Sequence, residues 1–474
     1  MIKTTDITSA IQHIEDDNIE TGNKSLLVVI VCVFFFWGFA ASGNALLIPV
    51  FKESFHLSQF QAQLVELSFY IAYFIGSVIY FIISIKRSHW LPHLSSKKGM
   101  IKGLLLSSLG SVLLVTATSI HSYIFFLLCL FIIALGFTLQ QIVANPLLIQ
   151  LGSVNTGAHR LILAGSVNSF GNTISPLILS AFLFGGIAAN VNGSALSLAS
   201  VRVPYVILAI LYIVFAIWFY KTPVPKAGLP ANEPIKDLGA LKYPQLLLGM
   251  IAVFCYVGGE VTMQSNLPAL IHSSNILGLP ARDAIHYLSL FGGCLMIGRW
   301  TGAVFSFKVS KTIQTVLIFL VPFLAFGTVL LVNWLGGSSV GEIVDYALFL
   351  PILIIALLIS RNDPVKILIF ASAAAIVMIT GGLLLSGKYA LYCIVSAALF
   401  SSLMWPCIFP IAIKGLGKYT QQGSSLLIMM ILGGAILPPF QGLLSDQPSI
   451  GIQLSYILPL LCFSYVGWYG LKMK

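Results

Sequence analysis

Long apolar runs alternate with short polar stretches along the chain, and this pattern predicts a series of membrane-spanning helices. Most runs reach the length of about 20 residues that a helix needs to cross about 30 Å of hydrocarbon. Strand-like alternation is absent, so helices, which satisfy their backbone hydrogen bonds internally, are the expected structure. Fourteen spans are expected, at residues 25–51, 60–85, 99–118, 122–150, 161–187, 202–220, 243–271, 284–306, 312–334, 343–360, 365–386, 389–413, 421–444 and 450–471.

The composition agrees with a polytopic membrane protein. Of 474 residues, 58% are hydrophobic and 8% are charged, against about 25% charged residues in a typical soluble domain. The mean hydropathy is +0.97. These values exclude a soluble globular enzyme, a disordered chain and a nucleic-acid-binding protein.

Lysine and arginine predict the orientation in the membrane, because these residues concentrate in cytoplasmic loops. With the N-terminus inside, 20 of the 25 basic residues fall on the inner side, 4 fall on the outer side, and Arg299 lies within a span. This distribution favours fourteen crossings with both termini cytoplasmic. It also explains the net charge of +10 without a nucleic-acid partner.

The same pattern divides the chain into four parts. Residues 1–24 are polar and acidic and are expected to form a mobile cytoplasmic tail, since a secretory signal would begin with basic residues. Residues 25–221 are expected to form an N-terminal six-helix bundle, residues 222–242 a proline-containing cytoplasmic linker, and residues 243–474 a C-terminal bundle. Proline-broken helices at Pro146 and Pro406 begin similar loops in the two halves, which is a transporter design. Twelve spans would complete that design, so 312–334 and 343–360 form an extra pair at about 312–360, with peripheral packing or an oligomer contact as its role.

Ionisable residues inside spans are costly and therefore mark functional candidates. Glu66 and Glu260 are the acids within spans, and Arg299 is the basic residue. A carboxyl removed from water can take up and release a proton near neutral pH, so both acids are candidates for proton coupling. Glu66 could instead be a neutral or paired structural acid, and Glu260 could bind sugar or pair with Arg299. Arg299 is a gating candidate next to Gly298 and Gly302, a spacing typical of close helix packing.

Amide and indole side chains form the candidate binding site. Amides donate and accept hydrogen bonds as hydroxyl groups do, and together with aromatic faces they suit a neutral polyhydroxylated ligand. Hydrogen bonding between helices is the alternative role for each of them. The substrate-binding candidates are Asn44, Gln140, Gln141, Asn145, Asn168, Gln264, Asn266, Trp37 and Trp405.

Other chemistries lack the residues they need. The seven cysteines all lie in apolar runs without C-x-x-C spacing, so we expect packing roles and no metal site. The sequence contains no G-x-x-x-x-G-K-[ST] phosphate loop for ATP-driven transport. It also lacks H-E-x-x-H and paired aspartates within spans, so we do not expect an enzyme.

Several motifs taken together resemble the fucose–proton symporter family of the major facilitator superfamily, in its glucose/galactose-type branch. The resemblance covers most of residues 30–445. It implies two six-helix bundles that rock about a central sugar site, driven by a proton gradient. The motifs are residues 35–39 (FFWGF), 57–62 (LSQFQA), 139–141 (LQQ), 144–146 (ANP), 159–161 (HRL), 168–171 (NSFG), 256–261 (YVGGEV), 298–299 (GR), 414–420 (KGLGKYT), 422–424 (QGS) and 433–439 (GGAILPP).

Two departures from this family concern the proton. Fucose-type members carry an aspartate just after the first-span asparagine, where Asn44 is followed here by Ala45, and their fourth-span glutamate falls at Gln141. We hypothesise that the proton role has moved to Glu66. An uncoupled carrier, a sodium-coupled carrier and a drug exporter of the same superfamily are the alternatives. A sensor that binds sugar without moving it is a further one.

The sequence thus predicts a multi-pass protein of the cell inner membrane that imports a neutral sugar by alternating access. The sugar is a hexose such as glucose or galactose, or a related deoxy- or amino-sugar. A proton is the expected coupling ion, with no other cofactor. The expected partners are the sugar and the lipid bilayer, and the expected oligomeric state is a monomer.

Overall fold

The computed structural model describes residues 4–86, 97–151, 157–183, 198–222, 238–280, 284–304, 309–337, 340–360 and 363–474. Every regular element in these ranges is helical. We call residues 4–222 the first half and residues 238–474 the second half. Most of the expected linker, residues 223–237, lies outside the described residues.

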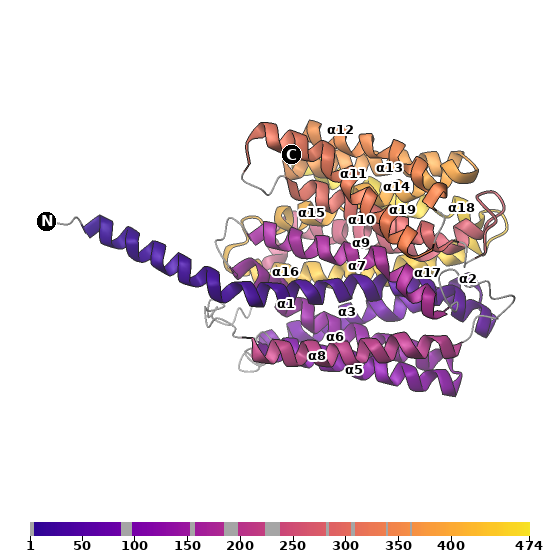
Figure 1. The fold of residues 1–474 in the computed structure, drawn as a ribbon, viewed down its shortest axis with the longest axis horizontal. Coiled ribbons are helices and arrows are strands. Elements are labelled where there is room, and N and C mark those ends of the chain that lie inside the picture. Colours follow the sequence, from indigo (N-terminus) through magenta and orange to yellow (C-terminus); the bar gives the residue numbers. More distant parts are fainter. Residues whose placement is uncertain are drawn as a thin grey trace.

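The described residues of the first half form seven α-helices. The long ones run roughly parallel to one long direction of the molecule (Figure 1). The seven helices are α1 (Thr4–Phe55), α2 (Gln59–Ala62), α3 (Leu64–Lys86), α5 (Lys97–Ile120), α6 (Tyr123–Gln150), α7 (Gly157–Leu183) and α8 (Arg202–Lys221), with the 3-10 helix η3 (Leu198–Val201) before α8. Residues 4–24, expected to be a mobile tail, continue α1 as helix and project beyond the other helices.

The second half contains more and shorter α-helices. They are α9 (Pro244–His272), α10 (Ile285–Ala303), α11 (Lys311–Leu335), α12 (Leu350–Ser360), α13 (Pro364–Leu384), α14 (Gly387–Ser401), α15 (Met404–Ile413), α16 (Thr420–Met429), α17 (Gly433–Ser445), α18 (Gly451–Leu454) and α19 (Ile457–Lys472). The 3-10 helices are η4 (Gly239–Lys242), η6 (Val340–Glu342), η7 (Val344–Phe349), η8 (Gly417–Tyr419) and η9 (Met430–Leu432).

Proline explains two of the interruptions in this half. A proline has no N–H to donate to the carbonyl four residues earlier. Pro406 therefore frees the carbonyl of Ser402, where α14 ends and α15 begins, and Pro459 frees that of Ser455, between α18 and α19. The expectation of a break at Pro146 was wrong, because α6 continues past this residue to Gln150.

Twelve helical segments among the described residues are long and apolar enough to cross a membrane. Two further expected spans, 161–187 and 284–306, correspond to α7 and α10, which are not among the twelve. Both helices carry asparagine, serine, histidine or arginine side chains within their length, and these side chains lower the mean hydropathy. The count of fourteen crossings stays a prediction.

The helices pack mainly within their own half. In the first half, α5 lies against α6 and α8, and α1 lies against α7. In the second half, α9 packs against α15, α17 and α19, and α13 packs against α14 and α19. The halves meet where α7 contacts α10, where α3 contacts α16 and α17, and where α2 contacts α17.

The pair α11 and α12 lies at the edge of the second half, as the expected extra pair does. Helix α11 packs against α10 and helix α12 against α13. Much of the surface of α11 is exposed and apolar, for example Phe319, Leu324 and Trp334. These exposed side chains place the pair at the periphery, and the choice between peripheral packing and an oligomer contact stays a prediction.

Candidate functional site

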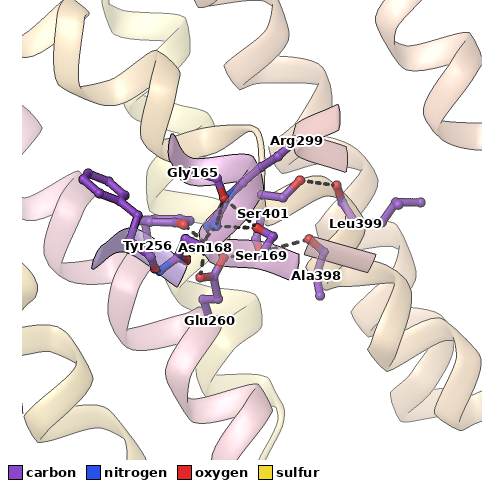
Figure 2. Close-up of polar contacts among 11 residues, drawn as sticks. Gly165, Asn168, Ser169, Tyr256, Glu260, Arg299, Ala398, Leu399 and Ser401 are labelled. Carbon is purple, nitrogen blue, oxygen red and sulfur yellow. Dashed lines mark hydrogen bonds and ion pairs between the residues drawn. The ribbon is translucent and has the colours of Figure 1, made fainter. Parts of the chain in front are cut away.

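A hydrogen-bonded network around Glu260 occupies the contact between the halves (Figure 2). Glu260 lies on α9, and its Oε2 accepts hydrogen bonds from the Ser401 hydroxyl of α14 at 2.7 Å and from the Tyr256 hydroxyl at 3.0 Å. Arg299 on α10 places its Nη2 3.9 Å from Glu260 Oε1. The ion pair between Glu260 and Arg299, one of the alternatives for Glu260, is therefore present in the structure.

Arg299 also extends into the first half of the protein. Its Nη1 donates to the carbonyl oxygen of Gly165 at 3.3 Å, to Asn168 Oδ1 at 3.3 Å and to Ser169 Oγ at 2.6 Å, all on α7. Asn168 in turn donates from Nδ2 to the carbonyl oxygen of Phe34 on α1 at 2.9 Å. One guanidinium thus connects α7 and α1 to the Glu260 carboxylate of the other half.

Two glycines that flank Arg299 allow α10 to come close to α14 and to the residues that follow it. A Cβ at Gly298 would lie 2.3 Å from the carbonyl oxygen of Leu399 on α14, and one at Gly302 would lie 2.7 Å from Leu403. Larger residues would push α10 away from α14. The close packing expected at Gly298 and Gly302 is confirmed.

Glu66 has very different surroundings. It lies on α3, its side chain is 2% exposed, and its Oε2 has no hydrogen-bond partner among the described residues. Asn44 of α1 lies beside the carboxyl, and the Asn44 Nδ2 is also without a partner in the described part of the chain. None of the ion pairs between described residues includes Glu66.

Tyr70 connects the neighbourhoods of the two acids. It lies one turn after Glu66 on α3, within electrostatic reach of Glu66, of Glu260 and of Tyr256. Its ring packs on Gly434 of α17, where a Cβ would lie 3.0 Å from the ring. The two acids predicted from the sequence are therefore both near one aromatic residue at the contact between the halves.

Two of the expected binding residues bond to each other inside the first half. Trp37 Nε1 donates to Gln140 Oε1 at 3.0 Å, and Gln140 Nε2 donates to Ser107 Oγ at 3.0 Å. Trp37 is 5% exposed and Gln140 is 0% exposed. These contacts match the alternative role that the sequence left open, hydrogen bonding between helices.

The half-buried candidates retain open side-chain surface. They are Gln141, Asn145, Asn168, Gln264 and Trp405. Gln141 donates to the Tyr73 hydroxyl at 3.3 Å, and the Trp405 ring lies 6.2 Å from the Tyr256 ring, measured between centroids. Trp405 thus lies next to Tyr256, whose hydroxyl donates to the Glu260 carboxylate.

Asn266 lies apart from this network. It is fully buried and bonds to Gln59, Gln63 and Gln441 at the end of the molecule where α1 passes into α2. The structure does not bring it together with Arg299.

Sequence reasoning missed Ser401, Ser169 and Tyr256 as members of the network. Tyr256 could have been found, because it lies one helical turn before Glu260. Ser169 adjoins Asn168, but a lone serine in a span carries little signal. Ser401 comes from a helix distant in sequence, so no local pattern indicates it. Within the described ranges, no group of three or more His, Cys, Asp and Glu side chains lies close enough together to hold a metal ion.

Comparison with known proteins identifies the family. The family model described as Major Facilitator Superfamily matches residues 26–360. The chain belongs to the Major Facilitator Superfamily. It is therefore a multi-pass membrane protein of a family of transporters.

Individual relatives agree with this membership. The chain is 32% identical over 448 residues to a glucose/galactose transporter of Brucella abortus (strain 9-941), covering 94% of this chain and 93% of the relative. It is 28% identical over 481 residues to the L-fucose-proton symporter of Escherichia coli (strain K12), covering 97% and 95%. Among solved structures it is similar to the transporter FucP in the outward conformation, with a TM-score of 0.66, 26% identity and coverage of 96% and 99%. These similarities confirm the predicted resemblance.

Proposed function

We propose that this protein is a secondary active transporter that imports a neutral sugar together with a proton by alternating access. The observation that carries the proposal concerns Glu66, a buried carboxyl that has no cation partner among the described residues and lies near a network that joins the two halves. The printed names of relatives that span nearly the whole chain support a sugar as substrate. The protein acts in the bacterial inner membrane, and it moves the sugar without changing it chemically.

The proposed topology follows from the distribution of basic residues. All fourteen expected segments cross the membrane, α7 and α10 included, and both termini are cytoplasmic. Residues 25–221 and 243–474 form the two bundles, residues 222–242 link them, and the protein acts as a monomer. Helices α7 and α10 can be polar because they face each other across the halves, where their side chains find hydrogen-bond partners instead of lipid.

The proposed sugar site uses the half-buried side chains. Gln141, Asn145, Asn168 and Gln264 supply donors and acceptors for sugar hydroxyls, and Trp405 offers a face for stacking. At one side of the site, Glu260 accepts hydrogen bonds from the sugar and Arg299 donates hydrogen bonds to it. Because both residues also belong to the network between the halves, they connect sugar binding to that contact. Trp37, Asn44, Gln140 and Asn266 are almost fully buried, so they act by holding neighbouring helices or, for Asn44, by contacting Glu66.

The position of Glu66 supports its role as the proton carrier. The resemblance places the family aspartate at position 45, where this chain has Ala45. The side chain of the preceding residue, Asn44, lies beside the Glu66 carboxyl. The Glu66 carboxyl on α3 therefore lies against α1 at the residue that precedes position 45 in the sequence. Protonation removes a buried charge and lowers the cost of moving the loaded site between its two openings.

Uptake by purified protein in proteoliposomes tests the proposal. When the outside of the vesicles is more acidic than the inside, the wild-type protein should accumulate labelled glucose. Glu66→Gln should exchange sugar without accumulating it. Glu53→Gln is the matched control, because Glu53 is an exposed acid at the end of α1, and it should behave as wild type. If Glu66→Gln still concentrates sugar under the pH gradient, the proton role of Glu66 is wrong.

The same vesicles separate the other possibilities. Accumulation that follows a sodium gradient would contradict proton coupling, and binding without flux would indicate a sensor. Competition of labelled glucose uptake by galactose, fucose, mannose and N-acetylglucosamine then identifies the preferred sugar. Inhibition by lipophilic drugs without inhibition by any sugar would indicate an exporter.

A further inference from the structure

The two halves are bonded to each other at one end of the molecule, where α2 approaches the end of α17 (Figure 1). Asp446 follows α17, and its Oδ1 accepts from the backbone N–H of Gln59 at 3.2 Å while its Oδ2 accepts from that of Phe60 at 3.0 Å. The first N–H groups of a helix have no partner within that helix. A carboxylate of the second half therefore satisfies two backbone donors of the first half.

A layer of buried amides lies beneath Asp446. Asn266 Oδ1 accepts from Gln59 Nε2 at 3.0 Å and from Gln63 Nε2 at 3.1 Å. Asn266 Nδ2 donates to Gln441 Oε1 at 3.0 Å, and Gln441 Nε2 donates to Ser455 Oγ at 3.0 Å. The four amide side chains are at most 5% exposed, so the layer excludes water between the halves.

The backbones of the two segments also approach closely. A Cβ on Gly442 of α17 would lie 3.0 Å from the Cα of Phe60 and 3.1 Å from the carbonyl oxygen of Gln59. Such a contact leaves little space for a ligand to pass between α2 and α17. Three independent features therefore close this end of the molecule: the Asp446 carboxylate, the amide layer and the backbone contact at Gly442.

We propose that Gln59, Gln63, Asn266, Gln441 and Asp446 form an outer lock that closes the entrance for substrate and must separate before sugar can enter. The inference goes beyond the proposed function, but it takes its direction from the proposed topology, which places α2 and the end of α17 on the outer side. All bonds of the lock across the halves are hydrogen bonds, for which water can substitute when the halves move apart. Closure is therefore reversible, as a transport cycle requires.

The lock is also next to the proposed proton carrier. Gln63 lies one helical turn before Glu66, and Asn266 lies one turn after Thr262 on α9. The Thr262 hydroxyl is fully buried and has no partner among the described residues. When the lock separates, water from the outer side reaches this level first, and with it a proton for Glu66.

Cysteine labelling from the outer side tests the lock. The reporter is Thr262→Cys in a background whose seven native cysteines are replaced by alanine and which elutes as a single species on size exclusion. In intact cells, a membrane-impermeant maleimide should label the reporter slowly when the lock is intact. Asp446→Ala should raise the labelling rate about fivefold, the effect of losing a typical helix cap, and Asn266→Ala about tenfold.

Asp345→Ala is the matched control. Asp345 is also an exposed acid, but its partner Lys388, at 2.8 Å, belongs to the same half, so labelling should stay at the starting rate. Because Asp446 is exposed, its replacement should leave folding intact, and elution as a single species on size exclusion checks this. Equal labelling in Asp446→Ala and Asp345→Ala overturns the proposal.

The readout does not depend on the substrate. Faster labelling in Asp446→Ala would support the lock even if the protein carried no sugar at all. Conversely, a proton-driven sugar carrier with unchanged labelling would retain its proposed function and lose the lock. The two proposals therefore fail separately.

Discussion

Glu66 and Glu260 are both acids within apolar helices, yet their surroundings are opposite. Glu260 has a guanidinium within 3.9 Å and two hydroxyl donors on one oxygen. Glu66 is more deeply buried, at 2% exposure, and has no cation partner among the described residues. A paired carboxylate is stabilised in its charged form, whereas an unpaired buried one is stabilised by taking up a proton.

This difference assigns different roles to the two acids. Glu260 belongs to a connection that spans α7, α9, α10 and α14, so we propose that it works mainly by holding a defined arrangement of the halves and one side of the sugar site. Glu66 lies in the first half, where a change of its charge alters the cost of burial without breaking an existing ion pair.

The largest effect is expected from removing the cation of the pair. Arg299→Met leaves the Glu260 carboxylate partly buried without a counter-charge, which should cost about 2–3 kcal/mol of stability and slow sugar exchange about 100-fold. Thermal unfolding of the purified variant and exchange in proteoliposomes measure the two quantities. The double variant Glu260→Gln with Arg299→Met should recover stability, and failure of that recovery would contradict a pair held by charge.

An intermediate effect is expected in the pH dependence of sugar exchange without a gradient. Between pH 5.5 and 8.5, wild-type exchange should fall about tenfold as the pH rises, because Glu66 loses the proton that the loaded carrier needs. The exchange rate of Glu260→Gln should show the same relative decline with pH, whereas the exchange rate of Glu66→Gln should not change with pH. A flat profile in Glu260→Gln and a sloping one in Glu66→Gln would reverse the assignment of the two acids.

The smallest effect is expected from single hydroxyl donors to Glu260. Tyr256→Phe removes one hydrogen bond but leaves Ser401 and Arg299 in place, so exchange should slow about fivefold, corresponding to about 1 kcal/mol. Tyr465→Phe is the control, because the Tyr465 hydroxyl donates to the Leu248 carbonyl on the same helix α9 but outside the network. Equal exchange rates in the two variants would show that Glu260 does not depend on the Tyr256 hydroxyl.

Much of the helical architecture could be predicted from the sequence because it depends on local composition. A run of about 20 apolar residues forms a helix in lipid whichever neighbours it later meets, and twelve of the fourteen expected segments meet this criterion in the structure. The close packing at Gly298 and Gly302 was also predictable, since two small residues one turn apart leave room for the backbone of a second helix to come close. The break expected at Pro146 failed because a proline weakens a helix locally, while the surrounding contacts decide whether it ends.

The partners of each polar side chain could be decided only by the tertiary structure. Sequence reasoning grouped Gln140, Asn168 and Asn266 as amides for one ligand, but the structure places them in three separate sets of contacts. Ser401 reaches Glu260 from a position 141 residues away, and Asp446 reaches Gln59 from 387 residues away. A side chain's chemistry is fixed by its residue type, but its partner depends on the rotation and packing of whole helices, which many distant contacts determine together.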